Sequence, residues 1–480
     1  MKQNFFIFLS LVAFACNNTM HPPAALNPVP NEHQLAWHER GQYAFIHFTI
    51  NTFTDKEWGY GDEPASIFNP SSFDAEQWVK TCKDAGLTGV VLTCKHHDGF
   101  CLWPSAYTEH SVKNSPWRDG KGDMVREVSD ACRKYGLWFG VYLSPWDRNS
   151  AAYATPDYIT YYRNQLTELL TNYGEVSEVW FDGANGGDGY YGGAREKRKI
   201  DNRTYYDWPN THAIVRRLAP KAMMFSDAGP DIRWCGNEKG FAGKTNWSII
   251  NNDTLYAGKA GINDVLNAGS EDGTAWIPSE VDVSIRPGWF WHEREDSLVR
   301  SPENLLKIYL ESVGRGANLI LNLPPDKRGL IHENDVAALK EWKKIIDETF
   351  AVNLAAGVKA SADTRRGRSI QFDAANVTDG LKDTYWATND NVTKGSIEIN
   401  LARDLTVKYI VIQEYIPLGQ RVKSFAVEAL DSNNKWQQVA SGTTIGFKRI
   451  LPLNGITTSK LRLCINDARA CPVISNVEVY

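Results

Sequence analysis

The sequence predicts an α/β protein, in which a (β/α)8-like TIM barrel is followed by an antiparallel β-sandwich. Three observations lead to this fold class. The 480 residues correspond to two or three domains at about 150 residues each. A pattern of helix, glycine and buried strand recurs along the first two thirds of the chain, and short alternating segments replace it after residue 350. With 42% hydrophobic and 23% charged residues, the composition is that of a globular protein.

The barrel is predicted from repeated β/α units. Helical periodicity, a glycine stop and a short buried strand follow one another three times: 75–85 with Gly86 and 90–92, 125–135 with Gly136 and 138–143, and 162–173 with Gly174 and 178–181. Two further units combine a helix at 208–218 with a strand at 223–226, and a helix at 303–313 with a strand at 318–322. With these, we count six or seven units, a number that favours a closed barrel over an open sheet. The absence of a GxGxxG turn after any strand argues against a nucleotide-binding, doubly wound fold.

A second domain is predicted over residues 353–480, after a barrel domain over residues 33–352. Its expected strands lie at 369–372, 396–401, 409–413, 424–430, 460–465 and 473–479, with Asp, Asn and Gly between them. The phrase NVTDG (376–380), followed by YWA (385–387), resembles the discoidin-like sandwich of the coagulation-factor type C family. Such sandwiches are often attached to glycosidases.

The N-terminus resembles a secretory signal. Lys2 precedes an apolar run that closes with Ala13-Phe14-Ala15, which predicts a signal peptide over residues 1–15 and export to the periplasm or cell surface. Cys16 directly after this site leaves two alternatives open, lipidation at Cys16 or simple cleavage. Residues 16–32 are rich in Pro, Asn and Ala and are expected to form a linker.

Charge and cysteine content limit the partners. A net charge of −5 and a pI near 6.1 lack the basic excess that nucleic acid binding requires. No apolar stretch after the signal is long enough for a transmembrane segment. The cysteines show no zinc-ribbon spacing, and Cys464 with Cys471 is the best candidate for a disulfide. Oligomeric state cannot be predicted from these features.

Polar and aromatic residues gather where the predicted strands end. Five consecutive strand ends carry such groups: His47 with Glu57 and Trp58, then His96 and His97, then Tyr142, then Trp180 and Asp182, then Asp227 and 231–238. Each alone could be a core or turn residue, but their convergence predicts a catalytic cleft at the C-terminal face of the barrel. His96-His97 lacks the i, i+4 spacing of a zinc site, and no GxSxG elbow occurs. A carboxylate pair in an aromatic pocket therefore predicts glycoside hydrolysis without metal or cofactor.

At these residues the chain resembles glycoside hydrolase family 29, the retaining α-L-fucosidases. The matching segments are FIHFTINTFTDKEWGYG (45–61), VVLTCKHHDGFCLWPS (90–105), GVYLSPW (140–146), VWFDGANG (179–186), SDAGPDIRWCGNE (226–238) and GRGANLILNLPPDKRGLI (314–331). The resemblance implies that Asp182 is the nucleophile and that Glu238 is the acid/base, with Glu280 as a rival. The RWCGNE block looks like the subgroup that acts on α-1,3/4-linked fucose of Lewis-type glycans.

The same resemblance implies the substrate-binding residues. His47, His96, His97, Tyr142 and Arg233 are expected to hold fucose hydroxyls, and Glu57, Trp58, Trp180 and Trp289 to complete the pocket. Trp103 or Phe100 is expected to receive the C5 methyl group, and residues 276–293 to form the aglycone-side lip. For both adjacent histidines to reach one pocket, the strand must bulge or end there. The alternatives are a broad-specificity fucosidase acting on α-1,2, α-1,6 and aryl linkages, and a fucose-binding, lectin-like protein without turnover.

Overall fold

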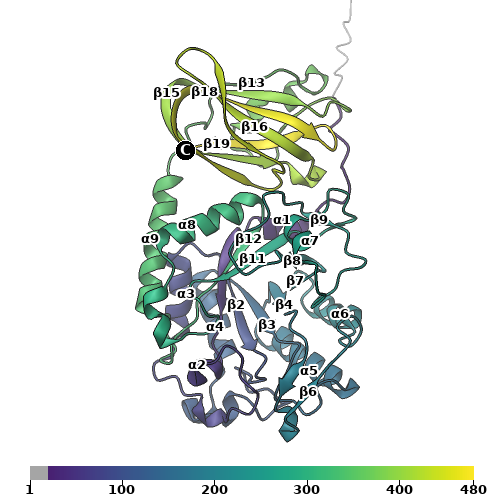
Figure 1. Cartoon of the computed structure of the whole chain (residues 1–480), viewed down its shortest axis with the longest axis vertical. Coiled ribbons are helices and arrows are strands. Elements are labelled where there is room, and N and C mark those ends of the chain that lie inside the picture. The colour runs from purple at the N-terminus through teal and green to yellow at the C-terminus, as the bar shows by residue number, and fades with distance from the viewer. Residues whose placement is uncertain (1–19) are drawn as a thin grey trace, which may run out of the picture.

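The computed structural model describes residues 20–480, so the predicted signal peptide and Cys16 lie outside the described residues. Figure 1 shows the two domains stacked along the long axis, with the barrel below and the sandwich above. Helix α9 leads from the barrel to the sandwich. Within the described residues, no helix is both long and apolar enough to cross a membrane.

The N-terminal domain is a closed barrel of parallel strands, as predicted. Its strand order is β1-β12-β11-β8-β7-β4-β3-β2, and neighbouring strands pair in parallel register. The strands are β1 (Gln42–Ile46), β2 (Gly89–Lys95), β3 (Trp138–Leu143), β4 (Glu178–Trp180), β7 (Met223–Ser226), β8 (Ile232–Trp234), β11 (Ser279–Ser284) and β12 (Asn318–Asn322). Short excursions form β5 (Gly187–Gly189) with β6 (Glu196–Arg198), and β9 (Ile249–Ile250) with β10 (Ala275–Trp276).

Helices occupy each of the five positions that periodicity predicts, 75–85, 125–135, 162–173, 208–218 and 303–313, and the structure adds others outside these units. They are α1 (Glu32–His38), α2 (Asn51–Thr54), α3 (Ala75–Asp84), α4 (Met124–Tyr135), α5 (Pro156–Asn172), α6 (Trp208–Leu218), α7 (Asn263–Ala268), α8 (Pro302–Glu311) and α9 (Glu333–Thr349). The Asp74 side chain caps α3 by accepting from the backbone N–H groups of Glu76 and Gln77. The Asp123 side chain caps α4 in the same way by accepting from Arg126 N. The apolar faces of these helices then pack on the outside of the barrel.

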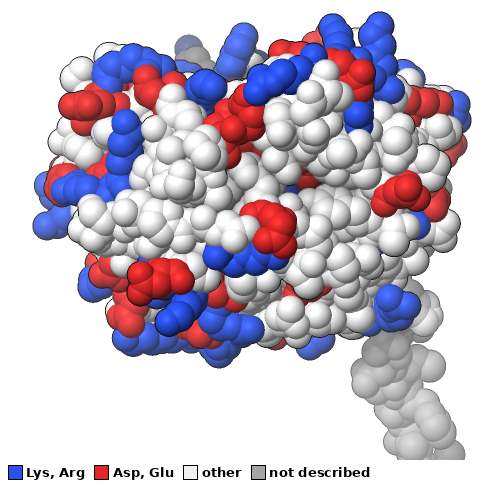
Figure 2. Space-filling model, turned by 90° about the horizontal axis from the view of Figure 1, so that it is seen from below, with Lys and Arg blue, Asp and Glu red and all other residues white. Residues whose placement is uncertain are grey.

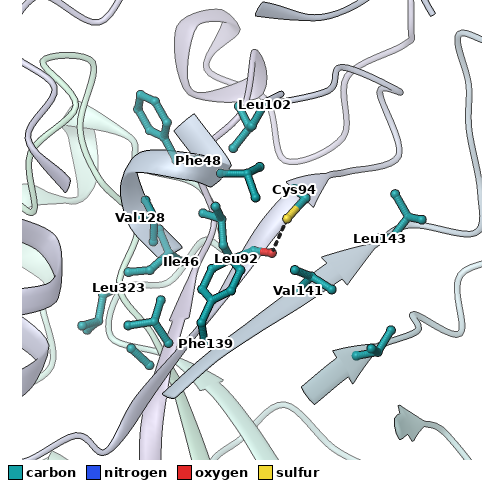
Figure 3. Packing of buried hydrophobic residues seen from close by; sticks show 14 of the residues in the cluster. Ile46, Phe48, Leu92, Cys94, Leu102, Val128, Phe139, Val141, Leu143 and Leu323 are labelled. Atoms are coloured by element: carbon teal, nitrogen blue, oxygen red, sulfur yellow. Dashed lines mark hydrogen bonds between the residues drawn. The ribbon is translucent and has the colours of Figure 1, made fainter. Parts of the chain in front are cut away.

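The core lies between the strands and the helices that cover them. Figure 3 shows side chains from β1, β2 and β3 meeting Val128 of α4, with Ile46, Leu92, Phe139 and Val141 closest to the centre of the view. Cys94 lies in this layer, and its thiol contacts Leu92 O at 3.4 Å. A second buried cluster, which includes Phe45, Trp180 and Phe225, fills the barrel interior and supports the site above it.

The C-terminal domain is an antiparallel β-sandwich, as predicted. Its strands are β13 (Ala360–Ala362), β14 (Trp386–Ala387), β15 (Gly395–Glu414), β16 (Val422–Leu430), β17 (Trp436–Gly442), β18 (Arg449–Ala468) and β19 (Val473–Val479), in the order β14-β19-β15-β18-β16-β17 with β13 on β15. The expected strand at 369–372 is wrong, because Ile370–Phe372 forms a 3₁₀ turn. The predicted disulfide is also wrong, since Cys464 and Cys471 are both free thiols. The Cys471 thiol instead lies 3.2 Å from the Arg421 guanidinium.

Polar contacts join the two domains. Gln420 of the sandwich accepts from Ser248 N at 2.7 Å and donates to Asn246 O at 3.0 Å. Thr444 accepts from Asn246 N at 2.9 Å. Residues 20–31 of the predicted linker run along the sandwich, where Leu26 N donates to Leu418 O at 3.0 Å. These contacts fix the sandwich on the barrel segment that lies between β8 and β11.

Candidate active site

A pocket opens where the barrel strands end. We call it the barrel pocket; its cavity volume is about 260 Å³, slightly below the range of roughly 300–1,000 Å³ typical of sites for drug-sized ligands. It therefore suits one small ring. Its lining residues are Phe45, His47, Trp58, His96, His97, Trp180, Asp182, Gly183, Ala184, Phe225, Asp227, Trp234, Glu238, Asp282 and Trp289. Figure 2, seen from the end away from the sandwich, shows acidic and basic residues intermingled among uncharged ones, which suits an uncharged ligand.

Asp182 lies in the barrel pocket directly after β4. The Tyr142 hydroxyl on β3 donates to Asp182 Oδ2 at 2.8 Å, and Ala184 N donates to Oδ1 at 2.7 Å. His97 Nε2 lies 3.9 Å from Oδ2. These contacts orient the Asp182 carboxylate. Its side chain is nevertheless 24% exposed, so a ligand can reach it. Next in the chain, a Cβ at Gly183 would lie 2.2 Å from Asp227 Oδ2, so only glycine fits there.

Glu238 is the second carboxyl group of the pocket and follows β8. Trp289 Nε1 donates to Glu238 Oε2 at 3.2 Å. Burial raises the pKa of Glu238, the Trp289 hydrogen bond opposes this rise, and the negative charges of Asp182 and Glu57 add to it. A carboxyl group with a raised pKa keeps its proton at higher pH, as a general acid must.

The histidines are neutral hydrogen-bonding groups. Burial lowers the pKa of His47 to about 3 and that of His97 to about 4. His47 Nδ1 lies 2.9 Å from Asn322 Oδ1, and His97 Nδ1 lies 2.7 Å from Ser144 Oγ, whose hydroxyl donates to Trp146 O. We therefore infer that both rings carry the proton on Nδ1, which leaves Nε2 to accept from a sugar hydroxyl.

The adjacent histidines both line the pocket because the strand ends before them. Strand β2 ends at Lys95, and its register with β3 shifts between Thr93 and Lys95. This irregularity removes strict alternation, so His96 and His97 share one side. Burial and the neighbouring His97 and His47 lower the pKa of His96 well below its ordinary value.

Aromatic rings form the walls. Trp180 stacks on Phe225 with ring centroids 4.0 Å apart, and Trp58 meets His97 edge-on at 5.3 Å. Trp58 is 54% exposed and so forms the rim, whereas Trp180 is buried. Sugar rings present apolar C–H faces and polar edges, and aromatic walls with hydrogen-bonding groups between them match both.

Two of the predicted site residues lie elsewhere. Glu280, the rival acid/base, is fully buried beneath the pocket, where Oε1 accepts from Trp180 Nε1 at 2.8 Å and Oε2 accepts from the Tyr43 hydroxyl. Arg233 is also fully buried; it donates to Leu266 O and Trp247 O at 2.8 Å each. Arg233 therefore holds backbone rather than fucose hydroxyls, and Glu280 holds a pocket wall.

Other expected contacts are indirect. The Tyr142 hydroxyl donates to Asp182, and Glu57 accepts from the backbone N–H of Trp289; neither Tyr142 nor Glu57 lines the pocket. Trp103, proposed for the C5 methyl group, donates to Glu168 and is buried away from the pocket, and Phe100 packs on Phe68. Of the predicted lip at 276–293, Trp289 and Asp282 line the pocket.

Two further acidic residues line the pocket: Asp227, which the sequence placed at a strand end without a role of its own, and Asp282, which was not singled out. Burial, with the charge of Asp182, raises the pKa of Asp227 to about 6. Burial and the charge of Glu238 raise the pKa of Asp282 well above its ordinary value, and Asp282 Oδ1 accepts from Trp234 Nε1 at 2.8 Å. Asp282 is two residues after Glu280 on β11, so the period of two along a strand could have placed both on the inner face.

Comparisons with known proteins identify the family of this chain. Residues 24–347 match the α-L-fucosidase family model, and residues 376–463 match the NedA-like, galactose-binding domain. The chain is 42% identical to α-L-fucosidase 1 of Arabidopsis thaliana, over 99% of this chain and 93% of that protein.

Solved structures show the same architecture. A glycoside hydrolase family 29 member from an unknown rumen bacterium is 45% identical with a TM-score of 0.85, over 96% of this chain and 78% of that one. A family 29 fucosidase of Ruminococcus gnavus in complex with fucose is 34% identical with a TM-score of 0.86, over 96% of both chains. The chain therefore belongs to glycoside hydrolase family 29 and is an α-L-fucosidase.

Proposed function

We propose that this α-L-fucosidase removes terminal α-1,3/4-linked L-fucose from branched, Lewis-type glycans with retention of configuration, using Asp182 as nucleophile and Glu238 as acid/base. One observation carries the mechanism: a pocket of single-ring size contains an accessible, oriented aspartate together with a glutamate whose pKa is raised. A double displacement needs these two groups.

The reaction proceeds in two balanced steps. First, an Asp182 oxygen attacks the anomeric carbon, the glycosidic bond breaks, and the leaving oxygen takes the Glu238 proton. Then a water molecule gives one proton to Glu238. The water oxygen attacks the anomeric carbon, and the ester bond between the sugar and Asp182 breaks. Both carboxyl groups return to their starting states, and the steps use no cofactor.

The residues that line the barrel pocket also recognise the substrate. His47 and His97 supply acceptors for ring hydroxyls, and His96, whose Nδ1 accepts from the Asn51 amide at 3.4 Å, supplies an Nε2–H donor. Phe225, stacked on Trp180, supplies an apolar surface for the C5 methyl group. A sugar with a hydroxymethyl group at this position would leave that hydroxyl unpaired. The fucose complex of the Ruminococcus gnavus relative supports fucose as the ligand.

Azide rescue tests the acid/base assignment. Replacing Glu238 with Ala should lower turnover of a natural fucoside by about 10²–10⁴-fold, because the leaving group loses its proton donor. Azide should then restore activity on an activated aryl fucoside and yield a fucosyl azide of retained configuration. Glu280→Ala serves as the comparison and should gain nothing from azide. Rescue of Glu280→Ala, with none for Glu238→Ala, would transfer the role.

A linkage panel tests the substrate class. The proposal is supported by the RWCGNE block and by the exposed Trp58 and the Trp289 wall, which offer aromatic surface to further sugars of a branch. We expect kcat/KM on a Lewis-type trisaccharide to exceed that on 2'-fucosyllactose by at least about tenfold, the effect of roughly 1.4 kcal/mol of added transition-state contact. Equal or higher activity on 2'-fucosyllactose would instead support the broad-specificity alternative.

We also propose that the enzyme is exported, on the strength of residues 1–16. The mass of the mature N-terminus, measured after cell fractionation, should begin at or near Cys16 and report any lipid on it. An intact Met1 in the cytoplasmic fraction would contradict export.

A further inference from the structure

A cluster outside the barrel pocket holds one of its walls. We propose that Asp55, His292 and Glu57, here called the carboxylate–histidine clamp, position Trp289 so that its indole N–H contacts Glu238. The clamp residues are positioning residues, and the inference rests on the proposed role of Glu238 as acid/base. The clamp joins the loop after α2 to the segment after β11.

The clamp centres on a buried histidine with two carboxylate partners. His292 is 1% exposed; its Nδ1 lies 2.5 Å from Asp55 Oδ1, and its Nε2 lies 2.6 Å from Glu57 Oε1. Arg294 donates to the other Asp55 oxygen at 2.7 Å. Because both ring nitrogens have an oxygen partner, the ring orientation is fixed from two sides.

Glu57 connects His292 to the backbone of Trp289 by hydrogen bonds. Its Oε2 accepts from Trp289 N at 2.8 Å, and its Oε1 accepts from Phe290 N at 3.2 Å. Asn322 donates to Trp289 O at 2.8 Å from the opposite side. A Cβ at Gly288 would lie 2.5 Å from Glu57 Oε1 and 2.9 Å from His292 Cδ2, so this close approach requires glycine.

The contact between Trp289 and Glu238 affects the protonation of Glu238. The groups that face Glu238 are Trp289, which donates at 3.2 Å, and the carboxyl groups of Asp182, Glu57 and Asp282. A donor aimed at a carboxylate favours the ionised form and lowers its pKa. Losing the Trp289 contact should therefore raise the pKa of Glu238. The alkaline limb of kcat/KM, where the free enzyme loses the acid proton, should move to higher pH.

A double-mutant cycle on the pH profile tests this inference. Trp289→Phe removes the indole donor while keeping an aromatic ring in the pocket wall, and should move the alkaline limb upward by about half a pH unit. His292→Leu should move it in the same direction and lower kcat/KM by about tenfold, and adding Trp289→Phe to it should move the limb no further. His292→Gln keeps one donor and should lie between wild type and His292→Leu. It also remains informative if His292→Leu does not fold.

His332→Leu is the matched control, because His332 also faces carboxylates, Asp296 and Glu333, but lies outside the barrel pocket. It should leave the limb in place. If Trp289→Phe moves the limb and neither His292 variant does, or if the two shifts simply add, the clamp does not act through Trp289. If Trp289→Phe leaves the limb unmoved, the inference also fails. Absence of azide rescue in Glu238→Ala would then show that the acid/base assignment fails as well.

Discussion

At the scale of single residues, Asp182 and Arg233 show how position relative to a strand end decides a role. Asp182 follows β4, points into the pocket and keeps an exposed oxygen. Arg233 lies within β8, where Ile232 and Trp234 belong to the interior cluster and the residue between them faces outward. Because side chains alternate between the two faces of a strand, Arg233 points away from the barrel interior.

Arg233 should matter for stability. Its guanidinium bonds to Leu266, Ile277 and Trp247 carbonyls and to Asn246, which ties the segment between β8 and β11 to the barrel. Arg233→Leu would leave these buried acceptors unpaired, so we expect the free energy of unfolding to fall by about 3 kcal/mol or more. Denaturant unfolding measures this.

Arg217→Leu on the exposed face of α6 is the control for this substitution, with an expected change within about 0.5 kcal/mol. A stable Arg233→Leu enzyme with a KM raised tenfold would return Arg233 to the substrate-binding residues.

At the scale of elements, regular β/α units were predictable and irregular ones were not. Helices α3 and α4 carry their own caps and apolar faces, so periodicity alone located them. Strand β8 has only three residues, and β11 carries Glu280 and Asp282 on its inner face, which breaks the apolar run expected of a buried strand. Their environment depends on partners distant in sequence.

Strand β11 also explains why part of the site was missed. Glu280 and Asp282 each accept an indole N–H, from Trp180 and Trp234 respectively, at 2.8 Å. The motif residues Asp182 and Glu238 could be proposed from sequence resemblance. The period of two could have placed Glu280 and Asp282 on the inner face of β11, but their tryptophan partners become apparent only when the barrel brings β4, β8 and β11 together.

In the sandwich, the two longest strands were predicted only in part. Strands β15 and β18 have 20 residues each, with register shifts where they pair, so each was expected as shorter pieces or only in part. Bulges interrupt the alternation that marks a continuous strand. At 369–372, alternating apolar and polar residues predicted a strand, but Ser369 and Asp373 cap successive 3₁₀ turns instead.

At the scale of the whole molecule, the barrel holds the candidate active site and the sandwich contacts the segment that follows Glu238. Residues 246–248, between Glu238 and β11, bond to Gln420 and Thr444 of the sandwich. The same Asn246 accepts from Arg233 at 3.1 Å. The order of this segment thus depends on both domains.

Trapping of the glycosyl-enzyme tests the central claim most directly. The electronegative fluorine of 2-deoxy-2-fluoro-L-fucosyl fluoride slows hydrolysis of the covalent intermediate, so the sugar should accumulate on the nucleophile. Peptide mass spectrometry of the inactivated enzyme should show one fluorofucosyl group on Asp182, and Asp182→Ala should stay unlabelled. A label on Glu238 or another carboxyl group, or an active enzyme that releases inverted fucose without labelling, would contradict the account.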